Sequence, residues 1–242
     1  MDNKKREQVL NYYNNVEYIN LAAKCAHHIH FDTIKDIQKY IKFNSSWKTL
    51  EVGCGKGVLR DAFPNWTGTD ISQKALSMVP NEYPTVLAEA DKIPLPDSSF
   101  DLVIMFDFIE HVANPQEVLI EALRLLRPNG YLIIRSPQLI LGKERVFSPL
   151  GIFRIFAELF YRLIDEIKKI MRLKISLRVR TQKPDYNIIG EDADAIYLFN
   201  PHNLCLHLIT FFNTKIINPL TFPNRLGLQY TKDKILIIKK LA

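Results

Sequence analysis

Three alternating glycines follow a short apolar run in the sequence LEVGCGKGVL. Gly53, Gly55 and Gly57 take side chains away from one loop, so main-chain N–H groups there can approach a ligand closely. The spacing differs from a dinucleotide fingerprint, which would need glycine at Val58, and from a P-loop, which ends in Gly-Lys-Ser/Thr. The loop therefore indicates a ligand site whose chemistry must be identified from the residues downstream.

Acidic residues follow the next three apolar segments in turn. Asp70 ends the second segment, Asp91 follows the third and Asp107 follows the fourth. In nucleotide-binding folds an acid about twenty residues beyond the glycine loop binds the ribose hydroxyls, and Asp70 lies in that interval. Each acid alone could be a strand-end or N-cap residue. Their order behind the glycines favours a nucleoside site.

The segments that carry these residues alternate between strand and helix patterns. Strands are predicted at 49–52, ending within 67–72, at 85–91, 100–106 and 131–136, with a final antiparallel pair at 213–220 and 234–241. Helices are predicted from Val58 toward Phe63, through Met78 and over 115–127. This alternation predicts an α/β fold, with seven mostly parallel strands covered by helices on both faces. Ligands in such sheets bind outside the carboxyl ends of the strands.

Two further parts surround this sheet in the predicted organisation. Residues 1–44 are predicted as an N-terminal helical cap, and residues 45–242 as one domain with an insertion at about 138–195. Within the insertion, apolar residues between Ser148 and Lys174 follow a helical stripe, which predicts an amphipathic lid helix. Alternatively, residues 148–174 lie on an anionic membrane surface or bind an RNA backbone.

Charge and cysteine usage bear on partners and compartment. The chain has a net charge of +6, and residues 143–183 hold eleven basic residues against four acidic ones, so its basicity is concentrated there. The three scattered cysteines, Cys25, Cys54 and Cys205, favour a reducing compartment. The first residues lack the apolar region of a secretory signal. We therefore expect a cytoplasmic protein, with peripheral membrane contact as an extension of that expectation.

Four segments together resemble the motifs of class I S-adenosylmethionine-dependent methyltransferases over Leu50–Pro137. They are LEVGCGKG, GTDIS, AEADKIPLPDSSFDLV and ALRLLRPNGYLIIRSP, in this order. The resemblance implies a Rossmann-like sheet, S-adenosylmethionine as cofactor and S-adenosylhomocysteine as product. Acidic residues also suit a cationic sulfonium better than a phosphate-bearing nucleotide.

The resemblance also implies a role for each residue at this edge. The glycines would line the methionine part of the cofactor, and Glu51 would help to hold its amino group. Asp70 would accept hydrogen bonds from both ribose hydroxyls, Asp91 from the adenine amino group, and Phe106 would border the reactive methyl. The predicted cofactor-binding residues are Glu51, Gly53, Gly55, Asp70, Ile71, Asp91, Lys92 and Phe106.

The sequence FDFIEHV supplies the predicted catalytic residues. Asp107, Glu110 and His111 would share one face of a helix beginning at the strand end. The pattern resembles ubiquinone-biosynthesis O-methyltransferases and small-RNA 2′-O-methyltransferases. His111 would act as a general base or contact the acceptor. The alternatives are a divalent metal ion held by the three residues, or structural roles at the helix start; no metal site is predicted.

The sequence as a whole predicts an S-adenosylmethionine-dependent methyltransferase. Its acceptor is predicted to be a small or lipid-like molecule methylated at oxygen, because transfer from an activated sulfonium requires mainly positioning and removal of the acceptor's proton. Two alternatives stay open at this point. One is an RNA methyltransferase, although the insertion is more aliphatic than most RNA-binding arms. The other is a non-catalytic partner subunit that binds the cofactor without turnover.

Overall fold

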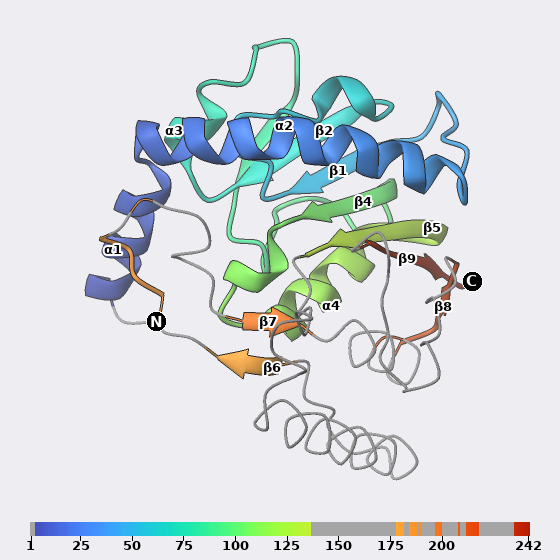
Figure 1. Ribbon diagram of the computed structural model, residues 1–242. Helices are drawn as coiled ribbons and strands as arrows, with labels where there is room; N and C mark the ends of the chain where they lie inside the picture. Colours follow the sequence, from blue (N-terminus) through green and yellow to red (C-terminus); the bar gives the residue numbers. More distant parts are fainter. Residues whose placement is uncertain are drawn as a thin grey trace, which may run out of the picture.

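A seven-stranded sheet forms the centre of the computed structural model, which describes residues 3–136, 178–181, 184–187, 189, 197–199, 208, 212–217 and 235–242 (Figure 1). Its strand order is β3-β2-β1-β4-β5-β9-β8. Strands β1 to β5 are parallel to one another, and β9 runs antiparallel to both β5 and β8. The strands are β1 (Thr49–Val52), β2 (Trp66–Asp70), β3 (Thr85–Leu87), β4 (Phe100–Phe106), β5 (Leu126–Arg135), β8 (Thr214–Ile216) and β9 (Ile235–Lys240). The predicted seven-stranded, mostly parallel sheet is confirmed.

Helices lie on both faces of this sheet. Figure 1 shows α2 above the sheet and α4 below it, with α1 beyond the arrowheads of the parallel strands. The helices are α1 (Asn3–Tyr13), α2 (Val16–Gln38), α3 (Gln73–Leu76) and α4 (Pro115–Leu125), with 3₁₀ helices η1 (Arg60–Ala62) and η2 (Ile109–His111). Among the described residues, no helix has both the length and the apolar character that crossing a bilayer requires.

Strand β4 divides the hydrophobic core into two clusters because its side chains alternate between the two faces of the sheet. Leu102, Ile104 and Phe106 pack on the side of α2, in one cluster with Ile37. Val103 and Met105 pack on the side of α4, together with Leu119 and other α4 residues. The near-continuous apolar sequence of β4 follows from burial on both faces.

Two of the predicted elements differ from the structure at the edge that follows the glycines. The helix predicted from Val58 toward Phe63 is wrong: only the 3₁₀ turn η1 forms, because the chain enters from a left-handed glycine loop and is extended again at Phe63. The third strand ends at Leu87 instead of Asp91. Leu87 is paired with Asp70, the last residue of β2, so residues beyond it have no strand to pair with.

The insertion contains a small sheet that the sequence did not predict. Strands β6 (Arg178–Thr181) and β7 (Tyr197–Phe199) pair antiparallel, and β7 lies next to η2. The predicted lid helix and the basic residues within 148–174 lie outside the described residues. Helices α1 and α2 occupy the predicted cap, while the proposed boundary at residues 44 and 45 stays a prediction.

Candidate functional site

The glycine loop after β1 is closely packed at Gly53, whereas the space beside Gly55 is open. Gly53 and Gly55 have φ values of 74° and 53°, in the left-handed region that favours glycine. A Cβ atom at Gly53 would lie 2.1 Å from Cδ2 of Phe108, whereas one at Gly55 would meet no described atom within 4 Å. The space beside Gly55 is therefore open, and the predicted contact of this loop with a ligand stays a prediction.

Asp70 is fixed by backbone N–H groups at the end of β2. Its Oδ2 accepts a hydrogen bond from the N–H of Gly55 and its Oδ1 from that of Ser72, each at 2.8 Å. Burial raises the pKa of Asp70, and these backbone hydrogen bonds oppose that shift. The backbone N–H of Ile71 opposes the shift in the same way. Since a carboxylate offers about four acceptor positions, capacity remains to accept from the hydroxyls of a ribose. The residues present thus fit a nucleoside at this position.

Glu51 lies beneath the same loop, only 5% exposed. Its Oε2 accepts a hydrogen bond from Nε1 of Trp66 at 2.7 Å. Burial raises the pKa of Glu51 to about 8, the charge of Asp70 acts in the same direction, and the Trp66 hydrogen bond opposes both. The side chain can therefore hold a proton near neutral pH and release it when a cation approaches. Its predicted contact with the cofactor's amino group stays a prediction.

A Glu51→Gln variant is expected to lose part of the pH dependence of stability. Because the folded-state pKa lies above the ordinary value of 4.5, the folded chain binds this proton more tightly than the unfolded chain. The resulting stabilisation is complete below about pH 4.5 and is lost as the pH rises through about 8. In urea denaturation, the wild-type free energy of unfolding should fall by up to about 1.4 kcal/mol per pH unit more steeply than that of the variant. Parallel curves would contradict the assignment.

The remaining predicted cofactor residues occupy different environments. Asp91 and Lys92 are exposed on the loop after β3, and Ile71 is half-buried next to Asp70. Phe106 is buried in the core on the α2 side, where its ring lies 6.2 Å from that of Phe63, centroid to centroid. The structure therefore directs this ring into the core, and the role predicted for it at the methyl group stays a prediction.

The cap is attached to three successive loops at the carboxyl edge of the sheet. Helix α1 is tied to the loop after β3, the turn between α1 and α2 to the residues after β2, and α2 to the glycine loop after β1. Nη2 of Arg6 donates to Oε1 of Glu89 at 2.7 Å. Oδ1 of Asn14 accepts from Oγ of Ser72 at 2.9 Å and from the backbone N–H of Lys74 at 3.0 Å. Nζ of Lys56 donates to Oδ1 of Asn20 at 3.0 Å. The cap thus lies over the edge where the cofactor is predicted.

An aromatic cluster belongs to the same cap. The rings of Tyr12, Tyr13 and Tyr18 lie with centroids 4.5 to 5.5 Å apart, and the ring of Tyr186 contacts that of Tyr12 at 5.5 Å. Tyr12 and Tyr186 also line a cavity of about 580 Å³ between α1 and the segment around residue 187. The cap therefore brings the insertion and the N-terminus together beside the sheet edge.

The acids after β4 are held by residues at the end of β5. Asp107 has a φ of 47°, unusual for a non-glycine residue. Its backbone N–H donates to the carbonyl of Arg135 at 2.8 Å, and its carboxylate is ion-paired with the Arg135 guanidinium. Arg135 is 5% exposed, and burial lowers its pKa to about 10, so it stays charged at neutral pH. This pair fixes Asp107 at the rim of the sheet.

Glu110 and His111 differ from their predicted arrangement. They lie in the 3₁₀ helix η2, and Asp107 precedes this helix in a left-handed conformation, so the predicted single α-helical face is wrong. Buried Glu110 accepts a hydrogen bond at Oε2 from Oγ of Ser136 at 3.1 Å. In the described part of the chain, no three His, Cys, Asp or Glu side chains are grouped closely enough for metal ligation. The predicted catalytic roles of these residues stay predictions.

Sequence reasoning missed three residues of this region: Phe108, Arg135 and Ser136. Arg135 carried a usable signal, since a charged residue at the end of a buried strand needs a partner, and the end of the neighbouring strand carries an acid. Ser136 follows from the same register, because β4 and β5 are parallel and end together. Phe108 gave no such signal, since its contact with the glycine loop depends on the turn at Asp107.

The comparisons with known proteins agree with this geometry. Residues 50–134 match the family model described as methyltransferase domain. A probable S-adenosylmethionine-dependent methyltransferase of Mycolicibacterium smegmatis is 33% identical over 114 residues, which cover 43% of each chain. A ubiquinone biosynthesis O-methyltransferase of Albidiferax ferrireducens is 32% identical, covering 42% of this chain and 48% of its own. The matches thus span less than half the length of these two relatives.

Solved structures share the fold over nearly the whole chain. A methyltransferase from Thermotoga maritima, described as a possible histamine N-methyltransferase, matches with a TM-score of 0.54 and 16% identity over 95% of this chain and 97% of its own. At this identity the likeness concerns the fold. Together with the glycine loop, Asp70 and the match over residues 50–134, it leads to one conclusion. The chain contains a methyltransferase domain over residues 50–134, similar to those of S-adenosylmethionine-dependent methyltransferases.

Proposed function

We propose that this protein transfers a methyl group from S-adenosylmethionine to a small or lipid-like acceptor, at an oxygen atom. The observation that carries the proposal is the carboxylate of Asp70, bonded to the backbone of Gly55 at the edge where the strands end. That bond holds a carboxylate, which can accept hydrogen bonds from ribose hydroxyls, beside the open space at Gly55. A structural strand-end aspartate would not need the neighbouring open glycine.

The chain's own residues would position the two reactants. When bound, the cofactor supplies a methyl group already activated on a sulfonium. Asp70 and the Gly55 loop would orient its sugar and methionine parts, and the cap contacts of Arg6 and Asn14 would limit access of water from that side. Asp107, held by Arg135, lies at the rim beside β4, where an acceptor hydroxyl could be oriented and its proton received by an acid or by His111.

The choice of a small oxygen acceptor is supported by residue chemistry and relatives. An oxygen nucleophile must lose a proton, and Asp107, Glu110 and His111, which follow β4, are the residues proposed to receive it. Ubiquinone biosynthesis O-methyltransferases are among the relatives, and so is a ubiquinone/menaquinone biosynthesis C-methyltransferase of Paraburkholderia phymatum, 27% identical over 64% of this chain and 70% of its own. Both names refer to lipid-like quinone biosynthesis.

Turnover with a panel of acceptors tests the proposal. Purified protein would be incubated with S-adenosylmethionine and phenolic, quinol-like and amine acceptors or a structured RNA, and S-adenosylhomocysteine would be quantified. Formation that depends on a hydroxyl-bearing small molecule supports the proposal. Turnover only with RNA would replace it by RNA methylation, and cofactor binding without turnover on any class would favour a non-catalytic partner subunit.

We further propose that the protein is cytoplasmic and associates peripherally with anionic membranes through residues 148–174. The support comes from the sequence, in which a basic face accompanies an apolar helical stripe over this range. Each basic residue near an anionic surface contributes about 1 kcal/mol. A lipid-like acceptor would be reached from such a surface.

Replacement of Lys168, Lys169 and Arg172 with serine is expected to reduce co-sedimentation with anionic vesicles at least about tenfold. Vesicles of zwitterionic lipid provide the reference, since they lack the negative surface charge. A matched triple variant with serine at Lys24, Lys35 and Lys42 removes the same charge from exposed positions elsewhere. If both variants bind anionic vesicles as wild type does, the proposed membrane surface is wrong.

A further inference from the structure

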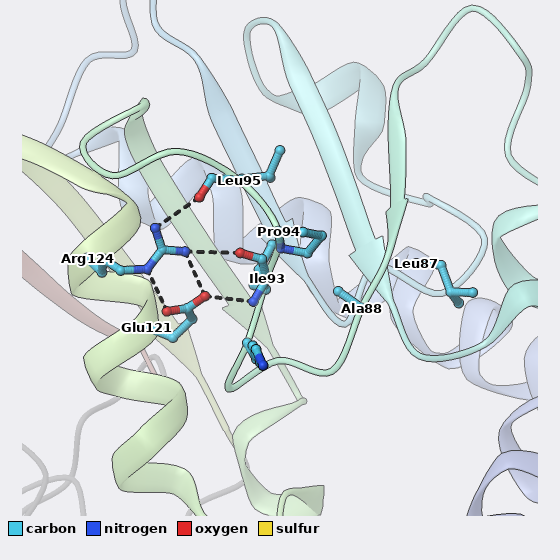
Figure 2. A pocket seen from close by; sticks show the side chains of 8 residues that line it. Leu87, Ala88, Ile93, Pro94, Leu95, Glu121 and Arg124 are labelled. Atoms are coloured by element: carbon cyan, nitrogen blue, oxygen red, sulfur yellow. Dashed lines mark hydrogen bonds and ion pairs between the residues drawn. The ribbon is translucent and has the colours of Figure 1, made fainter.

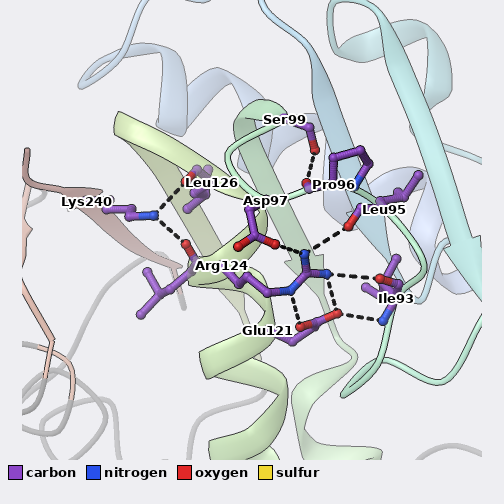
Figure 3. Close-up of polar contacts among 10 residues, drawn as sticks. Ile93, Leu95, Pro96, Asp97, Ser99, Glu121, Arg124, Leu126 and Lys240 are labelled. Atoms are coloured by element: carbon purple, nitrogen blue, oxygen red, sulfur yellow. Dashed lines mark hydrogen bonds and ion pairs between the residues drawn. The ribbon is translucent and has the colours of Figure 1, made fainter.

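We propose that Glu121 and Arg124 of α4 are positioning residues that hold the loop carrying Asp91 in place for adenine recognition. The inference rests on the proposed function, because it assumes that Asp91 accepts a hydrogen bond from the adenine amino group. The two residues belong to α4, which covers one face of the sheet, so they lie away from the edge that would contact the cofactor. Figure 3 shows their side chains pointing from α4 toward the segment between Ile93 and Asp97.

All three guanidinium nitrogens of Arg124 donate hydrogen bonds to this segment or to Glu121. Its Nε donates to Oε2 of Glu121 at 2.7 Å and its Nη2 to Oε1 of the same side chain at 2.8 Å. Nη2 also donates to the carbonyl of Ile93 at 3.0 Å, and Nη1 donates to the carbonyl of Leu95 at 2.9 Å and to the carboxylate of Asp97. A guanidinium has five N–H donors, and five acceptors surround this one. Its role is therefore to hold the loop, with no donor left for a ligand.

Glu121 completes the attachment from the same helix. Its Oε1 accepts a hydrogen bond from the backbone N–H of Ile93 at 2.6 Å, so both polar backbone groups of Ile93 are bound by α4 side chains. Glu121 is buried, and the hydrogen bonds from Arg124 lower its pKa, which keeps it charged. Ile93 is two residues from Asp91, so this attachment sets where the preceding residues lie.

The segment before Ile93 also has contacts of its own. The N–H of Ala88 donates to the carbonyl of Asp70 at 3.0 Å, the N–H of Lys92 donates to the carbonyl of Glu89 at 3.1 Å, and Ala90 packs against the core. Figure 2 shows the loop running from Leu87 to Leu95 around an open cavity, whose volume is about 510 Å³. Leu87 itself is 51% exposed at the edge of the sheet. On the outer side the loop is tied by the ion pair between Arg6 and Glu89, but both side chains are about half exposed, and such pairs contribute little. The turn from Glu89 to Lys92 shapes the loop around Asp91, and the α4 contacts at Ile93 attach the end of that turn to the rest of the domain.

The expected consequence is selective for the base. Asp70 is held by backbone N–H groups of Gly55 and Ser72, neither of which belongs to α4 or to the loop it holds, so the proposed hydrogen bonds to the ribose do not depend on α4. Loosening the loop would displace Asp91 relative to the adenine amino group while leaving the sugar site intact. Loss of a hydrogen bond to a charged group changes affinity by about tenfold or more.

Binding of S-adenosylhomocysteine and S-inosylhomocysteine tests the inference. The inosine analogue has an oxygen in place of the amino group, so a correctly placed Asp91 should make wild type prefer the adenine compound by about tenfold or more. In Arg124→Met this preference, measured by titration calorimetry, should fall below about threefold. In Glu121→Gln, which keeps a side-chain oxygen near Ile93, the preference for the adenine compound should fall less. This second variant also maintains the test if Arg124→Met does not fold.

A matched control is available three residues along the chain. Arg127 forms an ion pair with Asp101 at 2.9 Å, at the start of β4, so Arg127→Met removes a similar pair away from Asp91. It should lower stability while leaving the preference unchanged. A folded Arg124→Met protein with the wild-type preference would overturn the positioning role. If Asp91→Asn abolishes the preference and both α4 variants keep it, only this inference fails; if wild type binds neither compound, the proposed function fails as well.

Discussion

An Asp70→Asn variant is expected to bind S-adenosylmethionine about a hundredfold more weakly than wild type, or worse. The substitution preserves shape but replaces a charged acceptor by an amide, one end of which is a donor. Two hydrogen bonds from ribose hydroxyls would lose their charged partner, and hydrogen bonds to charged groups contribute about 1.5 to 3 kcal/mol each. The amide would also have to satisfy the N–H groups of Gly55 and Ser72 with a single oxygen. Isothermal titration calorimetry measures the loss.

Asp32→Asn supplies the matched control for this loss of affinity. Asp32 is exposed on α2 and paired with Lys35 at 3.0 Å, so its substitution makes the same chemical change on the surface. Its affinity for the cofactor should equal that of wild type. An Asp70→Asn protein that is folded and binds within about threefold of wild type would show that this carboxylate does not hold the ribose.

A Gly53→Ala variant is expected to lower the free energy of unfolding by about 2 to 4 kcal/mol. The left-handed φ of 74° strains any residue with a Cβ atom, and the new methyl group would lie 2.1 Å from the Phe108 ring. Gly55→Ala carries similar strain but meets no described atom within 4 Å, so its stability loss should be only about 1 to 2 kcal/mol. Urea denaturation compares the two.

The two glycine variants should differ in the opposite sense in their affinity for the cofactor: Gly55→Ala, which loses less stability, should lose more affinity than Gly53→Ala. The methyl group at Gly55 points into the open space where the cofactor is proposed, so Gly55→Ala should weaken cofactor binding more than it weakens the fold. A second substitution, Phe108→Ala, should recover part of the stability of Gly53→Ala by removing the collision. Equal stability losses at both glycines, with no coupling between Gly53 and Phe108, would contradict the packing described for this loop.

Strand positions could be predicted from sequence wherever burial on both faces imposed a continuous apolar run. Strand β4 was predicted with its observed limits, Phe100 to Phe106, for this reason. Strand β3, at the edge of the described sheet, was predicted four residues too long, because its end depends on where its partner β2 ends. The local sequence of a strand does not determine its pairing register with the neighbouring strand.

The candidate site could be predicted in part for a related physical reason. Glycines and acids at strand ends are visible in a sequence, and the parallel sheet brings Gly55 and Asp70 into contact as expected. The partners from β5 and α4 could not be found in this way. Arg135 meets Asp107 only because the latter adopts a left-handed turn, and Arg124 meets Ile93 only through the path of a loop without regular structure.

A crystal structure of the protein with S-adenosylhomocysteine tests the central claim most directly. The account predicts the nucleoside along the carboxyl edge of β1 to β3, with both ribose hydroxyls about 3 Å from the carboxylate of Asp70 and the adenine amino group at the same distance from Asp91. A nucleoside bound at another edge of the sheet, or one whose ribose is not contacted by Asp70, would contradict it.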